Sequence, residues 1–169
     1  AASSKAAKIA RIHGGFKATA EGNYSIGQIQ VVDIDVQEVI PKIISSSSEI
    51  IDLANSKSET LSKLGKGVKE ITCKEVKTSL NSMLIVELLI DVGDAMGANV
   101  TNTMCEAVAP LIEKLSGGRT LLRILSNYST KRMVTASAIF DKDSVGGEKV
   151  VDDMISAFQF ANNDTFRAV

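Results

Sequence analysis

The sequence contains no tryptophan, a single histidine and only two cysteines among its 169 residues, and aromatic residues make up 4% of it. A hydrophobic content of 44% is nevertheless enough for a core, which the shortage of aromatic residues predicts to be aliphatic. Cys73 and Cys105 lie far apart and have no partners at a metal-ligand spacing. Without a secretory segment, they are predicted to be buried free thiols of a cytoplasmic protein, and no metal site is expected.

The chain also lacks a charge bias and a long apolar run. Its formal net charge is −1, and lysine and arginine are spread along the chain, so it is expected to bind neither nucleic acid nor an anionic membrane surface. No apolar run approaches the length that a membrane span requires, and no membrane contact is predicted. The length fits one compact domain, or one domain with pieces of a neighbour.

Apolar residues recur at the spacings of strands and helices along the middle of the chain. Strands are predicted at 27–35, 68–76, 83–92 and 120–125, and helices at 36–54, 56–64 and 100–115. This order predicts an α+β fold, the ferredoxin-like split β-α-β sandwich, with helices on one face of an antiparallel sheet. The strand at 83–92 is nearly all apolar and is therefore predicted to be more central than its hairpin partner.

Four consecutive serines, Ser45–Ser48, lie within the predicted helix at 36–54. They fit either a linker or the solvent face of a helix. Because the apolar residues keep helical spacing on both sides of the serines, we expect one helix across them.

The two ends of the chain are predicted to hold a helix at 2–12, a strand at 131–140 and a helix at 147–161. The chain opens without an initiator methionine and stops just after a helix. It is therefore expected to be a piece of a larger protein.

The strand at 83–92 runs directly into a helix through a glycine-bearing turn. Gly93 and Gly97 relieve the steric limits of this turn, and Asn99 or Thr101 is expected to cap the first helical N–H groups. A helix start with free N–H donors suits an anion such as a pyrophosphate. The spacing matches neither the G-x-G-x-x-G nor the G-x-x-x-x-G-K-[ST] phosphate loop, so spacing alone favours ordinary turn glycines.

The turn and the helix after it carry the string Asp94-Ala95-Met96-Gly97-Ala98-Asn99, followed by Asn102-Thr103-Met104 and Glu106-Ala107-Val108-Ala109-Pro110-Leu111. This string resembles the cofactor-binding signature of the class II hydroxymethylglutaryl-coenzyme A reductases. The resemblance continues through Gly117-Gly118 and Leu122-Arg123-Ile124-Leu125-Ser126-Asn127. Weaker matches are Ala10-Arg11 with Gly14-Gly15-Phe16, Glu49-Ile50-Ile51-Asp52-Leu53-Ala54-Asn55, and Phe166-Arg167-Ala168. They fall in the family's order, so the resemblance covers nearly the whole chain.

The resemblance implies that a small ferredoxin-like domain, residues 24–127, binds NAD(P)(H) and is inserted in a larger domain that binds the thioester. Residues 1–23 and 128–169 would be flanking parts of that larger domain. Enzymes of this family reduce hydroxymethylglutaryl-CoA to mevalonate and CoA, or catalyse the reverse, by two hydride transfers. Both subunits of their dimer contribute to each site, so the resemblance also implies a homodimer.

The resemblance also assigns roles to single residues. Asp94, Met96, Gly97, Ala98 and Asn99 would contact the dinucleotide, with the backbone at 96–98 facing its pyrophosphate. Asn127 matches an asparagine near the nicotinamide and the substrate, and Arg167 matches an arginine that holds the acyl carboxylate. Judged without the resemblance, Asp94 fits a turn, Asn127 a loop and Arg167 a solvated surface charge.

Ser58 is an informative departure from the family pattern. NADH-preferring members carry an aspartate there, which can accept hydrogen bonds from the ribose hydroxyls. Here the position is a serine beside Lys57, and this removes a repulsion against a 2′-phosphate. Ser58 is therefore predicted to contact the cofactor and to favour NADPH, or use of both NADPH and NADH, although the neighbouring Glu59 acts in the opposite direction.

The family's catalytic glutamate, lysine, aspartate and histidine match no residue of this chain. His13, the only histidine, does not align with the family's general acid, so no catalytic residue is predicted here and the chain alone is expected to be inactive. The alternative from another class is a non-catalytic module, because ferredoxin-like sandwiches also serve as ligand-sensing or assembly domains.

Overall fold

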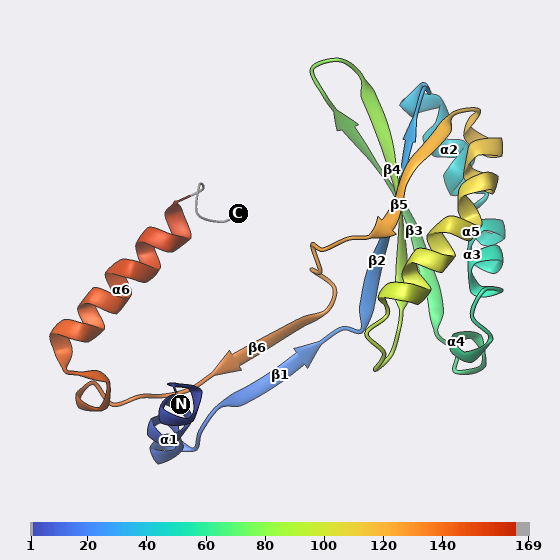
Figure 1. Cartoon of the computed structure of the whole chain (residues 1–169). Helices are drawn as coiled ribbons and strands as arrows, with labels where there is room; N and C mark the ends of the chain where they lie inside the picture. Colours follow the sequence, from blue (N-terminus) through green and yellow to red (C-terminus); the bar gives the residue numbers. More distant parts are fainter. Residues whose placement is uncertain (1, 165–169) are drawn as a thin grey trace. The chain divides into compact units, whose positions relative to one another are not determined.

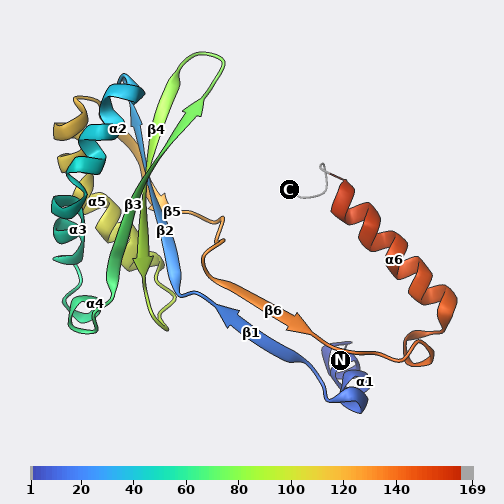
Figure 2. The same ribbon diagram turned by 180° about the vertical axis from the view of Figure 1, so that it is seen from behind.

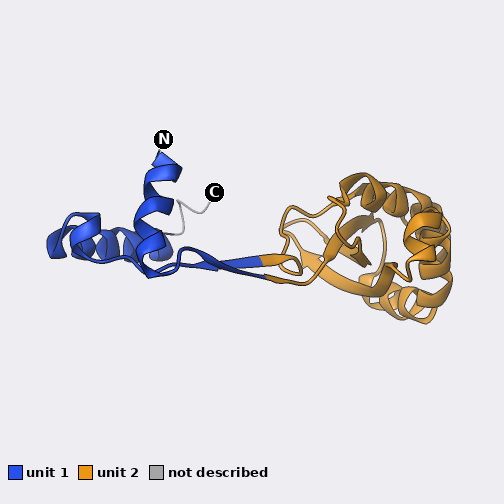
Figure 3. Cartoon of the chain, turned by 90° about the horizontal axis from the view of Figure 1, so that it is seen from below, with its two compact units in different colours: residues 1–19, 134–169 blue, residues 20–133 orange. Residues whose placement is uncertain are grey.

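The computed structural model describes residues 2–164. The chain divides into two compact units, one formed by residues 1–19 with 134–169 and the other by residues 20–133 (Figure 3). Each unit is described by itself below. Arg167, one of the predicted site residues, lies outside the described residues.

The unit of residues 20–133 contains a four-stranded antiparallel sheet in the order β3-β4-β2-β5. Its elements are β2 (Tyr24–Val32), α2 (Val36–Ser45), α3 (Ser47–Asn55), α4 (Glu59–Lys63), β3 (Gly67–Lys77), β4 (Ser82–Asp91), α5 (Ala98–Ser116) and β5 (Arg119–Leu125). Helices α2, α3 and α5 cover one face of the sheet (Figures 1 and 2). The α+β prediction of a split β-α-β sandwich is confirmed, and β4 is central, as its apolar sequence predicted.

The core lies between this sheet and its helices and is built from aliphatic side chains. Burial alternates along β2 and β4, so every second residue faces the helices. The largest fully buried side chains are Ile29, Ile43, Ile50, Leu84, Leu88, Ile90, Met104 and Ile112. The other face is more polar: Gln28 Nε2 donates to Glu87 Oε1 at 2.8 Å across β2 and β4.

The serine run interrupts the helix that was predicted to continue through it. The chain forms two successive helices, α2 and α3, separated at Ser46, which has φ −96° and ψ 11°. Ser45 Oγ donates to Lys42 O at 3.0 Å and Ser47 Oγ donates to Ile44 O at 2.6 Å. Such side-chain bonds compete with the helical N–H groups for the same carbonyls, and this explains the break. The segment is helical and is not a linker, but the prediction of one continuous helix was wrong.

The unit of residues 1–19 and 134–169 is less regular. It contains α1 (Ala2–Ala10), the 3₁₀ turns η1 (Arg11–His13) and η2 (Asp143–Val145), and α6 (Glu148–Asn163). Strands β1 (Lys17–Glu21) and β6 (Met133–Ser137) pair in a two-stranded sheet, within which the division between the units falls. The predicted helices at both ends are confirmed, the strand at 131–140 is shorter than predicted, and β1 was not predicted. No helix within residues 2–164 combines the length and the apolar character needed to cross a membrane.

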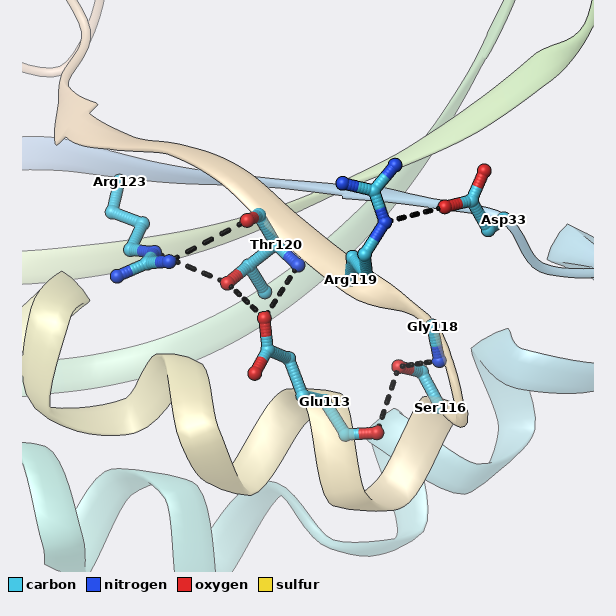
Figure 4. Close-up of polar contacts among 7 residues, drawn as sticks. All are labelled: Asp33, Glu113, Ser116, Gly118, Arg119, Thr120 and Arg123. Atoms are coloured by element: carbon cyan, nitrogen blue, oxygen red, sulfur yellow. Dashed lines mark hydrogen bonds and ion pairs between the residues drawn. The ribbon is translucent and has the colours of Figure 1, made fainter.

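The end of α5 is tied to the start of β5 by side chains (Figure 4). Glu113 Oε1 accepts from the backbone N–H and from the hydroxyl of Thr120, both at 2.8 Å, and Arg123 Nε donates to Thr120 Oγ1 at 3.1 Å. The backbone N–H of Thr120, followed by its hydroxyl, lowers the pKa of Glu113 from its ordinary value. Gly117, in the left-handed conformation at φ 72°, ends the helix.

Two buried threonines offer a matched test of this packing. Thr120 Oγ1 has the two partners just described, whereas Thr101 Oγ1, in the first turn of α5, has no hydrogen-bond partner in the part of the chain that the structure describes. We expect Thr101→Val to raise the free energy of unfolding by about 1 kcal/mol, because it removes an unsatisfied buried hydroxyl. Thr120→Val should lower it by about 1–3 kcal/mol.

Urea unfolding of the two variants measures both effects. Valine has nearly the shape of threonine, so the pair differs only in whether the lost hydroxyl was hydrogen-bonded. Equal losses of stability in the two variants would contradict the expected difference.

Candidate functional site

Strand register brings three connecting segments to one end of the four-stranded sheet. Asp91, at the end of β4, lies opposite Tyr24 at the start of β2 and Gly67 at the start of β3. The end of β5 lies there too, because Leu125 is opposite Gly27. The segment before β3, the loop after β4 and the segment after β5 therefore meet at this end (Figure 1). These segments carry all the predicted site residues that the structure describes, from Ser58 through the 94–99 string to Asn127.

The loop after β4 turns tightly, and the residues in its middle are exposed. Ala95 N donates to Val92 O at 3.2 Å, and Gly93 has φ 58°. Asp94, Ala95 and Met96 are exposed, Met96 to 75%. The middle of the loop is thus open to a ligand, whereas Gly93 and Gly97 at its two ends are buried.

Asp91 fixes the base of this loop. Its Oδ1 accepts from the backbone N–H of Gly93 at 2.9 Å and lies 3.4 Å from Lys66 Nζ. Burial acts to raise the pKa of Asp91, but the Gly93 N–H and the Lys66 ammonium outweigh it, so the net pKa lies below its ordinary value. The carboxylate therefore stays ionised at neutral pH and holds both groups. Sequence reasoning did not single out Asp91 or Lys66.

Helix α5 begins without a side-chain cap. Its N-cap is Gly97 in the left-handed conformation, φ 88°, and Thr101 N donates to Gly97 O at 3.0 Å as the first helical bond. The prediction that Asn99 or Thr101 caps the helix was wrong, because both lie inside its first turn. Consequently the N–H groups at 98–100 have no hydrogen-bond partner among residues 2–164.

Gly97 is required by its surroundings as well as by its backbone angles. A Cβ at this position would lie 2.8 and 2.9 Å from the two methyl groups of Val92, and 3.0 Å from Ser25 Oγ. Val92 and Ser25 are both buried. The loop can therefore close onto the sheet only with a glycine here.

Ser58 and Asn127 lie on the two flanking segments. Ser58 is the N-cap of α4: its Oγ accepts from Leu61 N at 3.3 Å. The neighbouring Glu59 pairs with Lys63 at 2.7 Å within the same helix. Asn127 is exposed just after β5, and its carbonyl accepts from Ser129 N at 3.1 Å.

Arg132 reaches the loop from the segment after β5. Its Nη1 donates to the carbonyl oxygen of Met96 at 3.1 Å. A single arginine in a connecting segment has no periodicity or motif spacing, and this is why the sequence did not indicate it.

The two thiols take no part in this arrangement. Cys105 is buried as predicted, whereas Cys73 is only half-buried, and both are free. Burial raises the pKa of Cys73 to about 11 and that of Cys105 to about 12, so both are protonated at neutral pH. Within residues 2–164 no three histidine, cysteine, aspartate or glutamate side chains cluster as metal ligands. The unpaired backbone N–H groups at the start of α5 are chemically suited to bind an anion.

Comparisons with known proteins agree over almost the whole chain. A family model described as hydroxymethylglutaryl-coenzyme A reductase matches residues 1–169. The 3-hydroxy-3-methylglutaryl-coenzyme A reductase of Archaeoglobus fulgidus is 46% identical over 168 residues, which are 99% of this chain and 38% of that relative.

Solved structures from Streptococcus pneumoniae show the same likeness. One 3-hydroxy-3-methylglutaryl-coenzyme A reductase matches with a TM-score of 0.87 and 34% identity, over 99% of this chain and 46% of that one. The class II reductase bound to NADPH in open conformations matches with a TM-score of 0.84 and 35% identity, over 99% of this chain and 42% of that one. The chain thus spans less than half the length of these relatives. It belongs to the hydroxymethylglutaryl-coenzyme A reductase family.

Proposed function

We propose that this chain is the nicotinamide-dinucleotide-binding part of a reductase that converts hydroxymethylglutaryl-CoA to mevalonate and CoA, or catalyses the reverse, by two hydride transfers. The observation that carries the proposal is the loop after β4, exposed at residues 94–96, which leads into a helix whose first N–H groups have no partner among the described residues. Family membership and a relative solved with NADPH bound support it.

The pyrophosphate of the dinucleotide is proposed to bind at the start of α5. Partial positive charge gathers at a helix N-terminus, and the free N–H groups of Ala98 and Asn99 are suited to donate to phosphate oxygens. Met96 and Gly97 bring the backbone close to the ligand because neither places a branched side chain over it. Asp94 is proposed to contact the dinucleotide from the exposed side of the loop.

Asn127 and Arg167 are proposed to contact the reacting groups, which are the nicotinamide and the acyl substrate. Asn127 follows β5 at the same end of the sheet as the loop, where its exposed amide suits contact with nicotinamide and substrate. Arg167 is proposed to bind the acyl carboxylate as a guanidinium–carboxylate pair.

The proposal also assigns the segments of the chain to two domains with different roles. Residues 24–127 are proposed as the small cofactor domain, and residues 1–23 and 128–169 as flanks of the larger thioester-binding domain. The catalytic glutamate, lysine, aspartate and histidine are proposed to come from that larger domain, within a cytoplasmic homodimer. His13 does not align with the family's general acid, and its Nε2 is 2.8 Å from Asp141 Oδ1 within the same unit.

The test is turnover by the full-length protein. With hydroxymethylglutaryl-CoA present, we expect it to oxidise NADPH or NADH, followed as the loss of reduced-nicotinamide absorbance, and to form mevalonate. The isolated 169-residue chain is expected to show no turnover. Absence of turnover with both cofactors would contradict the proposal and leave the ligand-sensing or assembly module as the better account.

The choice of cofactor can be tested at Ser58. We expect Ser58→Asp to shift the ratio of kcat/KM for NADH to that for NADPH about tenfold towards NADH, because a carboxylate repels the 2′-phosphate and accepts from ribose hydroxyls. Ser58 caps α4 in the structure, and aspartate and asparagine cap helices as well as serine does. Ser58→Asn is therefore the matched control, with the cap kept and no charge added. An equal ratio in all three proteins would exclude Ser58 from cofactor selection.

A further inference from the structure

Arg132 differs from the two arginines of β5 in that no carboxylate among residues 2–164 pairs with it. Arg119 Nε is 2.7 Å from Asp33 Oδ2, and Arg123 Nη1 is 2.9 Å from Glu106 Oε2 (Figure 4 shows the first pair). Arg132 forms no ion pair with any carboxylate among residues 2–164, and its hydrogen bond goes to the neutral carbonyl of Met96. Its positive charge is therefore not compensated by the protein.

The acidic groups of the loop do not change this conclusion. Asp91 is already engaged by the Gly93 N–H and by Lys66. Asp94 is exposed and forms no ion pair with Arg132. A guanidinium has five N–H donors in a rigid plane, and the Met96 carbonyl uses one of them. Arg132 is partly exposed, and its hydrogen bond to the Met96 carbonyl holds the guanidinium beside the loop.

We infer that Arg132 binds the pyrophosphate of the dinucleotide while one of its N–H groups remains on the Met96 carbonyl. This inference rests on the proposed function, because it names a further residue of the same cofactor site. A planar guanidinium can hold the loop and donate to a phosphate oxygen at once. A lysine ammonium is a compact charge on a flexible stem and cannot reproduce both contacts in fixed geometry. The loop conformation and ligand binding are thus coupled through Arg132.

The inference is tested on the full-length protein with Arg132→Met and Arg132→Lys, and with Arg119→Met as the matched control. The dissociation constants of NADPH, NADH and ADP-ribose are measured by titration, because ADP-ribose carries the pyrophosphate without the nicotinamide. We expect Arg132→Met to weaken all three ligands alike, by about tenfold to a hundredfold, and Arg132→Lys to weaken them less. Arg119→Met is expected to bind like the wild type.

A readout that loop support alone would not change is the salt dependence of binding. With one cation fewer at the phosphates, the NADPH dissociation constant of Arg132→Met is expected to rise less steeply with ionic strength. Should Arg132→Met not fold, the Arg132→Lys variant decides the question by the same titrations. Unchanged affinities in the Arg132 variants would overturn the inference, whereas a wild-type protein that binds none of the three ligands would overturn the proposed function itself.

Discussion

Gly97→Ala is expected to lower the free energy of unfolding by about 2–5 kcal/mol and to weaken NADPH binding at least tenfold. The left-handed conformation of Gly97, φ 88°, costs a residue with a Cβ about 1–2 kcal/mol. The new methyl would also approach both Val92 methyl groups to within 3 Å, and overpacking of this kind typically costs a further 1–3 kcal/mol. Relief of that contact requires the loop to move away from the start of α5, where the pyrophosphate is proposed to bind.

Gly117→Ala is the matched control for this prediction. Gly117 is also left-handed, φ 72°, but a Cβ there would meet nothing within 4 Å. Gly117→Ala therefore measures the cost of the left-handed backbone alone. We expect it to lower the free energy of unfolding by about 1–2 kcal/mol and to leave the NADPH affinity unchanged. Urea unfolding measures the stability of each variant, and titration of the full-length protein measures its affinity for NADPH. If Gly97→Ala were no more damaging than Gly117→Ala in either measurement, the tight contact at Val92 would not be present in solution.

The regular part of the fold was predictable because it follows from burial. β2 and β4 alternate between the core and the open face, and the apolar stripe of α5 faces the sheet, so period and phase identify both kinds of element. β1 escaped prediction because all its residues are exposed and its only apolar residues, Ala18 and Ala20, are weak strand formers. Its existence depends on pairing with β6, which is distant in sequence.

The sequence indicates candidate-site residues only where a local string carries the family pattern. Gly93 and Gly97 mark the turn, the family signature extends from Asp94 to Asn99, and Asn127 ends another matching string. The contacts of Lys66 with Asp91 and of Arg132 with Met96 join residues 25 and 36 positions apart. The fold of the chain brings these residues together, and no local sequence pattern predicts their contacts.

Gly27 sets how closely α5 approaches the sheet, and Gly27→Val is expected to prevent stable packing. Gly27 lies within β2, and a Cβ there would overlap Cys105 Sγ and lie 3.1 Å from Thr101 Cγ2, both on α5. Both side chains are fully buried, so neither can move into solvent. We expect Gly27→Val to cost about 3 kcal/mol or more, and Gly27→Ala about 1–3 kcal/mol. In a strand with free space, replacing glycine by alanine would instead stabilise.

A double-mutant cycle identifies the cause of this cost. Cys105→Ala removes the sulfur that the new methyl would meet, and alone it is expected to cost about 1 kcal/mol for the lost packing. If Gly27 is small because Cys105 lies against it, the double variant Gly27→Ala/Cys105→Ala is less destabilised than the sum of the single variants, by about 1–2 kcal/mol. Additive losses in urea unfolding would show that the two positions do not touch. Because the start of α5 carries the free N–H groups proposed for the pyrophosphate, Gly27→Ala is also expected to weaken NADPH binding, and the second substitution to restore part of it.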